Sequence, residues 1–161
     1  MLSRRGFMGR MGGLFLVGLS SRRLMAELAS GQPGKTPITV YKSSSCGCCV
    51  KWVDHLRANG FEPTVYDRED MDSLKDELGV PKEVRSCHTA RLEGYLIEGH
   101  VPASDIRRLL IERPKQAGLA APGMPTGAPG MAEPGAPTGG YDVLAFRKSG
   151  TTQLFARHQL T

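Results

Sequence analysis

At 161 residues and 40% hydrophobic composition, the chain has room for one compact domain with a leader and a long loop, and no run approaches the ~18 apolar residues of a membrane span. Its net charge of +5 lies in residues 1–35, which hold six basic side chains against one acidic, whereas the rest of the chain balances 15 basic against 15 acidic side chains. A neutral body lacks the positive field that attracts phosphate backbones, so the composition excludes a nucleic-acid partner.

The first 33 residues are typical of an export signal. Arg4 and Arg5 precede an apolar stretch from Met11 to Leu19, which is the order of a secretory leader. An arginine pair followed two residues later by phenylalanine resembles the twin-arginine motif, whose route exports folded proteins. The alternatives are a basic amphipathic tail or an uncleaved anchor. We predict a signal over residues 1–33, a domain over 34–161, and a periplasmic protein without membrane contact after signal removal.

The segment from Thr36 to Gly79 predicts strand, helix, strand and helix. Residues 37–41 are β-branched and aromatic, as in a strand, and the serines at 43–45 offer hydroxyls to cap a helix. Apolar side chains at 49, 52, 53 and 56 then follow the helical period, and Asn59-Gly60 ends that helix. Residues 61–66 predict a second strand, and Pro63 indicates either an edge strand or an early position in the strand. A second helix runs from Met71 to Leu78.

The second half of the domain is expected to add a strand, a helix, a long loop and a hairpin. Cys87 and His88 lie in a loop, residues 91–97 predict one strand, and Pro102 suits the first turn of a helix. Residues 114–140 contain 13 Gly or Pro and show no core-forming pattern. Residues 141–146 and 152–156 flank a Lys-Ser-Gly turn, which is typical of a hairpin. The resulting βαβα-βα-ββ order predicts an α/β, thioredoxin-like single domain with a Pro/Gly-rich loop over 114–140.

The four cysteines indicate a site instead of a structural framework. Cys46, Cys48 and Cys49 are crowded into four residues, and only Cys87 is remote. Adjacent cysteines rarely bridge each other because the geometry strains the peptide between them. A strand followed by a cysteine-bearing turn and a helix places thiols at a helix N-terminus, where the partial positive charge favours thiolate.

Two chemistries compete for this turn. Cys46 and Cys49 have the C-x-x-C spacing of a thiol–disulfide oxidoreductase. Three thiolates from one turn with a fourth from a facing loop are instead a ligand set for a soft metal such as Cu(I). Zinc is less favoured, because four-thiolate zinc sites show paired C-x-x-C knuckles, although a zinc-stabilised docking domain is a third option. The residues favour a metal-binding protein and leave open whether it has copper or thiol redox activity.

Several motifs in order resemble one known family. They are a strand before Cys46-Gly47-Cys48-Cys49, then Cys87-His88-Thr89-Ala90, then residues 95–102 (YLIEGHVP), then Pro122-Gly123-Met124-Pro125. Together they look like the CopG-type family of periplasmic copper-resistance proteins, over the chain from about Thr36 to its C-terminus. The resemblance implies a thioredoxin-like domain whose cysteines hold Cu(I), with a multinuclear thiolate cluster and redox interconversion of copper as further expectations. It also implies partner proteins that exchange copper.

One departure bears on the redox alternative. Thioredoxin-like oxidoreductases place a cis-proline before the third strand, whereas this chain has Cys87 there. The predicted metal ligands are therefore Cys46, Cys48, Cys49 and Cys87, joined by His88 and Met124.

The other candidates have weaker support. His100 is expected to cap a helix or to orient a ligand. Met131 repeats the Ala-Pro-Gly-Met unit of Met124 and is a weaker ligand candidate. Trp52 is expected in the core, and His55 and His158 on the surface.

Overall fold

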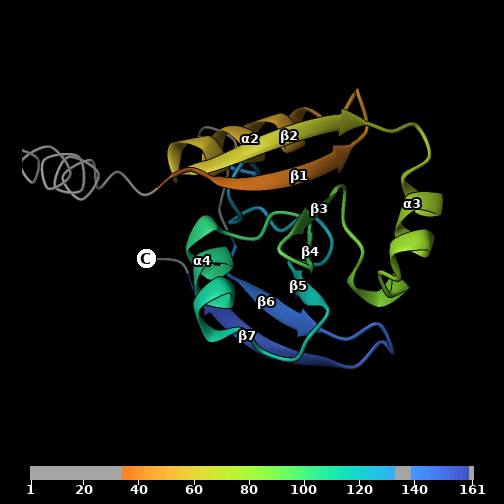
Figure 1. Cartoon of the computed structure of the whole chain (residues 1–161), viewed down its shortest axis with the longest axis vertical. Helices are drawn as coiled ribbons and strands as arrows, with labels where there is room; N and C mark the ends of the chain where they lie inside the picture. Colours follow the sequence, from red (N-terminus) through yellow and green to blue (C-terminus); the bar gives the residue numbers. More distant parts are fainter. Residues whose placement is uncertain (1–33, 133–138, 160–161) are drawn as a thin grey trace, which may run out of the picture. The chain divides into compact units, whose positions relative to one another are not determined.

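The computed structural model describes residues 34–132 and 139–159. The signal predicted over residues 1–33 lies outside them. From Lys35 onward the described residues form one compact unit (Figure 1). Within the described part of the chain, no helix has the length and apolar character that crossing a membrane would require.

A seven-stranded sheet forms the centre of this unit, and it confirms the mixed α/β single domain. The strand order is β2-β1-β3-β4-β5-β6-β7. The β1/β2 and β4/β5 neighbours are parallel and the others antiparallel. Its strands are β1 (Thr36–Lys42), β2 (Phe61–Asp67), β3 (Thr89–Leu92), β4 (Tyr95–Glu98), β5 (Gly118–Ala120), β6 (Tyr141–Phe146) and β7 (Thr152–His158). The edge position, one of the two that Pro63 indicated, is confirmed by β2.

The three predicted helices are present as α2 (Gly47–Ala58), α3 (Met71–Leu78) and α4 (Ala103–Glu112). A 3₁₀ turn, Lys82–Val84, follows α3. The serine cap expected for α2 is wrong: its N-cap is Cys46, and no side chain caps it. The serine hydroxyls bond elsewhere, Ser43 with Ser45 and Ser44 with Glu69.

The sheet has a buried core on each face. On one face α2 and α4 contribute Trp52, Leu56 and Ile106 to the larger cluster. On the other face Leu96, Ala120 and Phe146 pack against the chain that leaves α3. Consecutive strand residues alternate between the two clusters, as the two-residue period of a strand requires. The face away from α2 and α4 is therefore also buried.

The single strand predicted over residues 91–97 is wrong, because the chain forms two strands there. β3 and β4 pair antiparallel around Glu93 and Gly94, whose φ angles are 46° and 88°. Two consecutive residues with positive φ are typical of a type I′ hairpin, which reverses the chain within two residues.

The expectation that residues 114–140 contribute no core is also wrong. β5 lies inside the sheet between β4 and β6, and its three residues are fully buried. Gly118 allows this pairing, since a Cβ there would lie 1.8 Å from the Leu96 carbonyl oxygen. A three-residue strand of small side chains is too short to show a sequence period, which is why the pattern does not reveal it.

Candidate metal centre

The cysteine turn lies where β1 passes into α2. The Cys46 N–H donates to the Ser43 carbonyl at 3.1 Å, and Cys46 then becomes the N-cap of α2. Cys48 and Cys49 lie in the first turn of the helix, where unpaired N–H groups and the helix dipole favour negative charge. The sequence-based placement of these cysteines at a helix N-terminus is confirmed.

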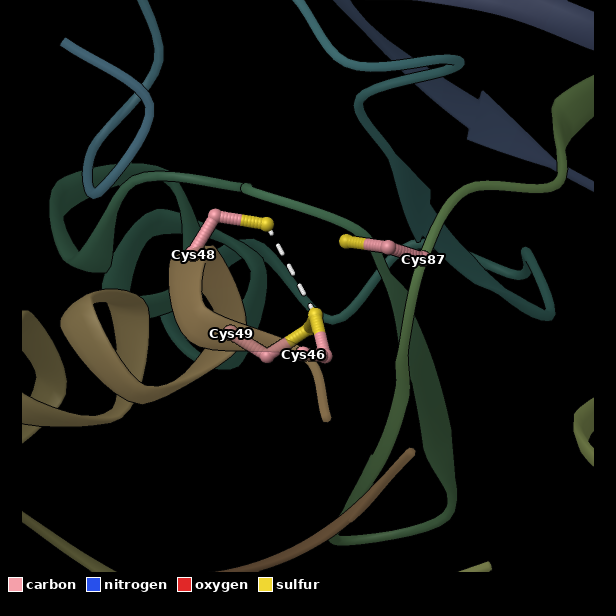
Figure 2. A group of neighbouring side chains, drawn as sticks. All are labelled: Cys46, Cys48, Cys49 and Cys87. Atoms are coloured by element: carbon pink, nitrogen blue, oxygen red, sulfur yellow. Dashed lines mark hydrogen bonds between the residues drawn. A yellow bond between two sulfur atoms is a disulfide. The ribbon is translucent and has the colours of Figure 1, made fainter. Parts of the chain in front are cut away.

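Two of the three thiols in this turn are joined. Cys46 and Cys49 form a disulfide, and Cys48 and Cys87 are free. The Cys48 Sγ lies 3.6 Å from the Cys46 Sγ (Figure 2). Cys49 is buried, whereas Cys46 and Cys48 are partly exposed. The turn can therefore exist with a C-x-x-C disulfide and one spare thiol.

Cys87 reaches the turn from the opposite side. β1 pairs antiparallel with β3, with Tyr41 opposite Thr89, so the loop before β3 faces the turn after β1. Figure 2 shows the Cys87 sulfur pointing toward the sulfurs of the helix. All four Sγ atoms lie within 4.8 Å of one another. The structure thus brings together every cysteine that the sequence nominated.

The free thiol of Cys87 is not a ready nucleophile. Burial, followed by the neighbouring Cys48, raises the pKa of Cys87 to about 12. At neutral pH this group carries its proton, and a metal ion that binds it must displace that proton.

Two histidines lie beside Cys87. His88 and His100 are both fully buried. The Cys87 Sγ is 3.3 Å from His88 Nδ1 and 3.1 Å from His100 Nε2. Burial lowers the pKa of both rings, most strongly for His88, so both are neutral near pH 7. Neutral imidazoles beside a thiol are a common metal-ligand combination.

The orientation of His100 is fixed by a backbone carbonyl. The Pro129 oxygen lies 2.7 Å from His100 Nδ1, so Nδ1 carries the proton and donates it. The lone pair of the neutral ring is then on Nε2, which faces Cys87. Sequence reasoning offered a helix cap or an orienting hydrogen bond to a ligand for His100, and the structure places its Nε2 at hydrogen-bond distance from Cys87, as the orienting role requires. Because Cys87 lies 13 residues earlier, the sequence did not show which residue His100 would contact.

A segment of residues 122–131, here called the strap, lies against both the start of α2 and the loop that carries Cys87. Ala128 is buried, and Gly123 pairs with Ser86 beside Cys87. A Cβ on Gly130 would lie 2.7 Å from the backbone nitrogen of Trp52 and 3.0 Å from the Cys48 carbonyl oxygen. The strap therefore touches both the cysteine helix and the Cys87 loop.

The remaining candidates fall at different distances from this centre. Met124 is 61% exposed, and Met131 is partly buried in the strap. Trp52 is a core residue as predicted: its indole N–H donates to the Val101 carbonyl at 2.9 Å, and its ring lies 4.3 Å from that of His88.

Two histidines predicted as surface residues have structural roles instead. His55 Nε2 accepts the Ala103 N–H at 3.1 Å and so caps α4. His158 pairs with Asp105 at 2.7 Å, which ties β7 to α4. Their partners are about 50 residues away in sequence, so the local pattern could not reveal them.

Comparisons with known proteins show what this chain is similar to. Residues 84–131, which hold Cys87, both buried histidines and the strap, match a family described as "Protein of unknown function, DUF411". The solved structure titled "Copper resistance protein copG- Form 1" is 42% identical, with a TM-score of 0.72 and coverage of 78% of this chain and 99% of that chain. "Copper resistance protein copG- Form 2" is 43% identical, with a TM-score of 0.71 and coverage of 76% and 98%. A search of curated proteins found no match.

Proposed function

The chain belongs to the CopG family of copper resistance proteins, and on that premise we propose that it binds Cu(I) in the periplasm through Cys46, Cys48, Cys49 and Cys87. The observation that carries this proposal is the convergence of four sulfur atoms within 4.8 Å from two separate elements. Thiolates are the ligands that select Cu(I), and four sulfurs this close suit bridging between more than one ion. Zinc is a less favoured occupant.

Binding by all four sulfurs requires the Cys46–Cys49 disulfide to be reduced. Two electrons from an external thiol reductant, together with two protons, convert the disulfide into two thiols, and copper then displaces the thiol protons. In the reverse sense, the dithiol can give its two electrons to two Cu(II) ions, which yields two Cu(I) ions, the disulfide and two released protons, and we propose this interconversion of Cu(II) and Cu(I) as an accompanying activity.

Two further residues are proposed as accessory ligands. His88 contacts Cys87 and is buried in the centre, so its imidazole is available to an ion held by that sulfur. Met124 is exposed and directly follows Gly123, whose backbone pairs with Ser86. The backbone of Met124 therefore lies next to the loop that carries Cys87. A thioether binds Cu(I) without losing a proton.

The setting of the protein is part of the proposal. We infer a thioredoxin-like arrangement, which the β2-β1-β3-β4 order with α2 and α4 on one face supports. The twin-arginine pattern of residues 1–33 supports export of a folded domain to the periplasm, and an exported copper binder implies proteins that exchange metal with it. The neutral body supports the absence of a nucleic-acid or membrane partner.

A second candidate function is thiol–disulfide exchange by Cys46 and Cys49. The observation that favours it is the disulfide itself, formed by a C-x-x-C pair at a helix N-terminus. An exchange reaction of Cys46 and Cys49 does not use Cys87, whereas copper binding by four sulfurs requires it. Replacing Cys87 therefore separates the two functions.

One pair of measurements on Cys87→Ser separates the two functions. Under anaerobic, reducing conditions we expect the variant to bind Cu(I) weaker by about 100-fold or more against a competing chelator, because a hydroxyl replaces one soft ligand. Its rate of reducing a disulfide substrate is expected to match the unmodified protein. Full copper affinity in the variant would place Cys87 outside the site and refute the four-thiolate proposal. Ser149→Ala, in the turn between β6 and β7 where its hydroxyl contacts Thr151, leaves every sulfur and its contacts in place and is the control.

A further inference from the structure

A buried ion pair lies directly behind the Cys87 loop, on the face of the sheet away from α2. Lys75 comes from α3 and Glu98 from the end of β4, and their side chains are 3% and 0% exposed. Such a pair is a poor device for stability alone, because apolar side chains of similar volume often stabilise a fold as well or better. Its contacts point to another role.

The carboxylate of Glu98 holds the chain on both sides of Cys87 and His88. Its Oε1 accepts the Ser86 N–H at 2.7 Å and also pairs with the Lys75 ammonium. Its Oε2 accepts the Thr89 hydroxyl at 2.6 Å, and the Lys75 ammonium donates to the same Thr89 oxygen at 2.9 Å. The two anchored residues, 86 and 89, are those immediately before and after the Cys87-His88 pair.

The backbone beside this clamp leaves little room for another arrangement. Gly99 follows Glu98, and its N–H donates to the His88 carbonyl at 2.9 Å. A Cβ at Gly99 would lie 2.5 Å from the Ser86 side chain. The loop is therefore pressed against the end of β4, and the carboxylate supplies the hydrogen bonds that fix its register there.

We propose that Glu98, oriented by Lys75, is the positioning residue of the metal centre, and that it holds Cys87 in place opposite the helix cysteines. Metal–ligand distances tolerate changes of only ~0.2 Å, so a loop released from the carboxylate no longer presents its sulfur in the required place. The clamp itself is independent of copper, while its use rests on the proposed Cu(I) function.

Two double variants separate positioning from stability. Lys75→Met with Glu98→Leu removes both charges and the acceptors for Ser86 and Thr89. Lys75→Met with Glu98→Gln also removes both charges but keeps a side-chain oxygen for the Ser86 N–H and a polar group for Thr89. Because both variants lack the ion pair, a difference between them in a measured property is due to the hydrogen bonds from residue 98 to Ser86 and Thr89. Urea midpoints of both establish that they fold.

The first readout needs no metal. In the oxidised protein, where Cys46 and Cys49 are bonded, the alkylation rate of Cys87 by iodoacetamide is followed by mass spectrometry of its peptide. The Leu variant is expected to react faster by about ten-fold or more, because its loop opens the half-buried thiol to solvent, whereas the Gln variant stays near the unmodified protein. Equal rates in all three proteins would overturn the proposal.

The second readout is Cu(I) affinity of the reduced proteins against a chelator. We expect a loss of about ten- to 100-fold in the Leu variant and a substantially smaller loss in the Gln variant, as for residues that orient metal ligands. Equal losses in the two variants would also overturn the positioning role. If the unmodified protein bound no Cu(I) while the alkylation rates differed as expected, the copper function would fail and the clamp would stand.

Discussion

The contact between the strap and the cysteine helix makes Gly130→Ala a sharp test of the packing around the centre. Gly130 has a φ of 83°, and an added Cβ would lie 2.7 Å from the backbone nitrogen of Trp52 and 3.1 Å from the Lys51 carbonyl carbon. A left-handed conformation costs an L-residue about 1–2 kcal/mol, and overpacking against backbone that cannot rotate away adds about 1–3 kcal/mol. We expect the free energy of unfolding to fall by about 3 kcal/mol.

Gly123→Ala is the matched control, because Gly123 lies in the same strap with a φ of 68° and has nothing within 4 Å of an added Cβ. It carries the conformational cost without the collision, so its loss should be about 1 kcal/mol. Both are measured by urea unfolding of the reduced protein, followed by fluorescence of Trp52, the chain's one tryptophan. Equal losses in the two variants would mean that the strap does not press on the helix.

Two further predictions concern a histidine cap and the methionines. Burial lowers the pKa of His55 below its usual 6.5, and its Nε2 accepts the Ala103 N–H only while it is unprotonated. This cap of α4 contributes about 1 kcal/mol to the free energy of unfolding. The contribution is complete above pH 6.5 and is lost as the pH falls through the lowered pKa. Urea midpoints of metal-free protein between pH 7.5 and 5 should therefore fall more steeply than those of His55→Gln, and parallel curves would exclude the cap as the cause. Replacing Met124 and Met131 together by Leu should keep the fold and thiolate-bound copper but speed copper release to a chelator. Unchanged release kinetics would remove both thioethers from the site.

The sequence predicted the cysteines of the centre but not the residues that hold them in position. Crowded thiols after a strand indicated a helix N-terminus, and Cys87 was nominated because it stands where an oxidoreductase has proline. Both inferences depend on local spacing, and the fold then brings the four sulfurs together. Periodicity also gave all three helices, since each has apolar residues at the helical spacing.

Features that depend on distant partners could not be predicted in this way. Lys75 and Glu98 look like ordinary surface charges in sequence, and only their meeting across 23 residues shows that both are buried. His100 was not named as a ligand because its neighbours, Cys87 and Pro129, are 13 and 29 residues away. The β5 strand was missed for a different reason: Gly118–Ala120 is held by its pairing with β4 and β6 and has no propensity of its own.

The proposed function depends on the four cysteines binding Cu(I) together. The most direct test is the copper content and thiol count of protein isolated anaerobically from the periplasm of copper-exposed cells. We expect more than one Cu(I) per chain and, after copper is removed under denaturing conditions, four titratable thiols. Protein that contains no copper and shows two thiols beside a Cys46–Cys49 disulfide would contradict it and favour thiol–disulfide exchange.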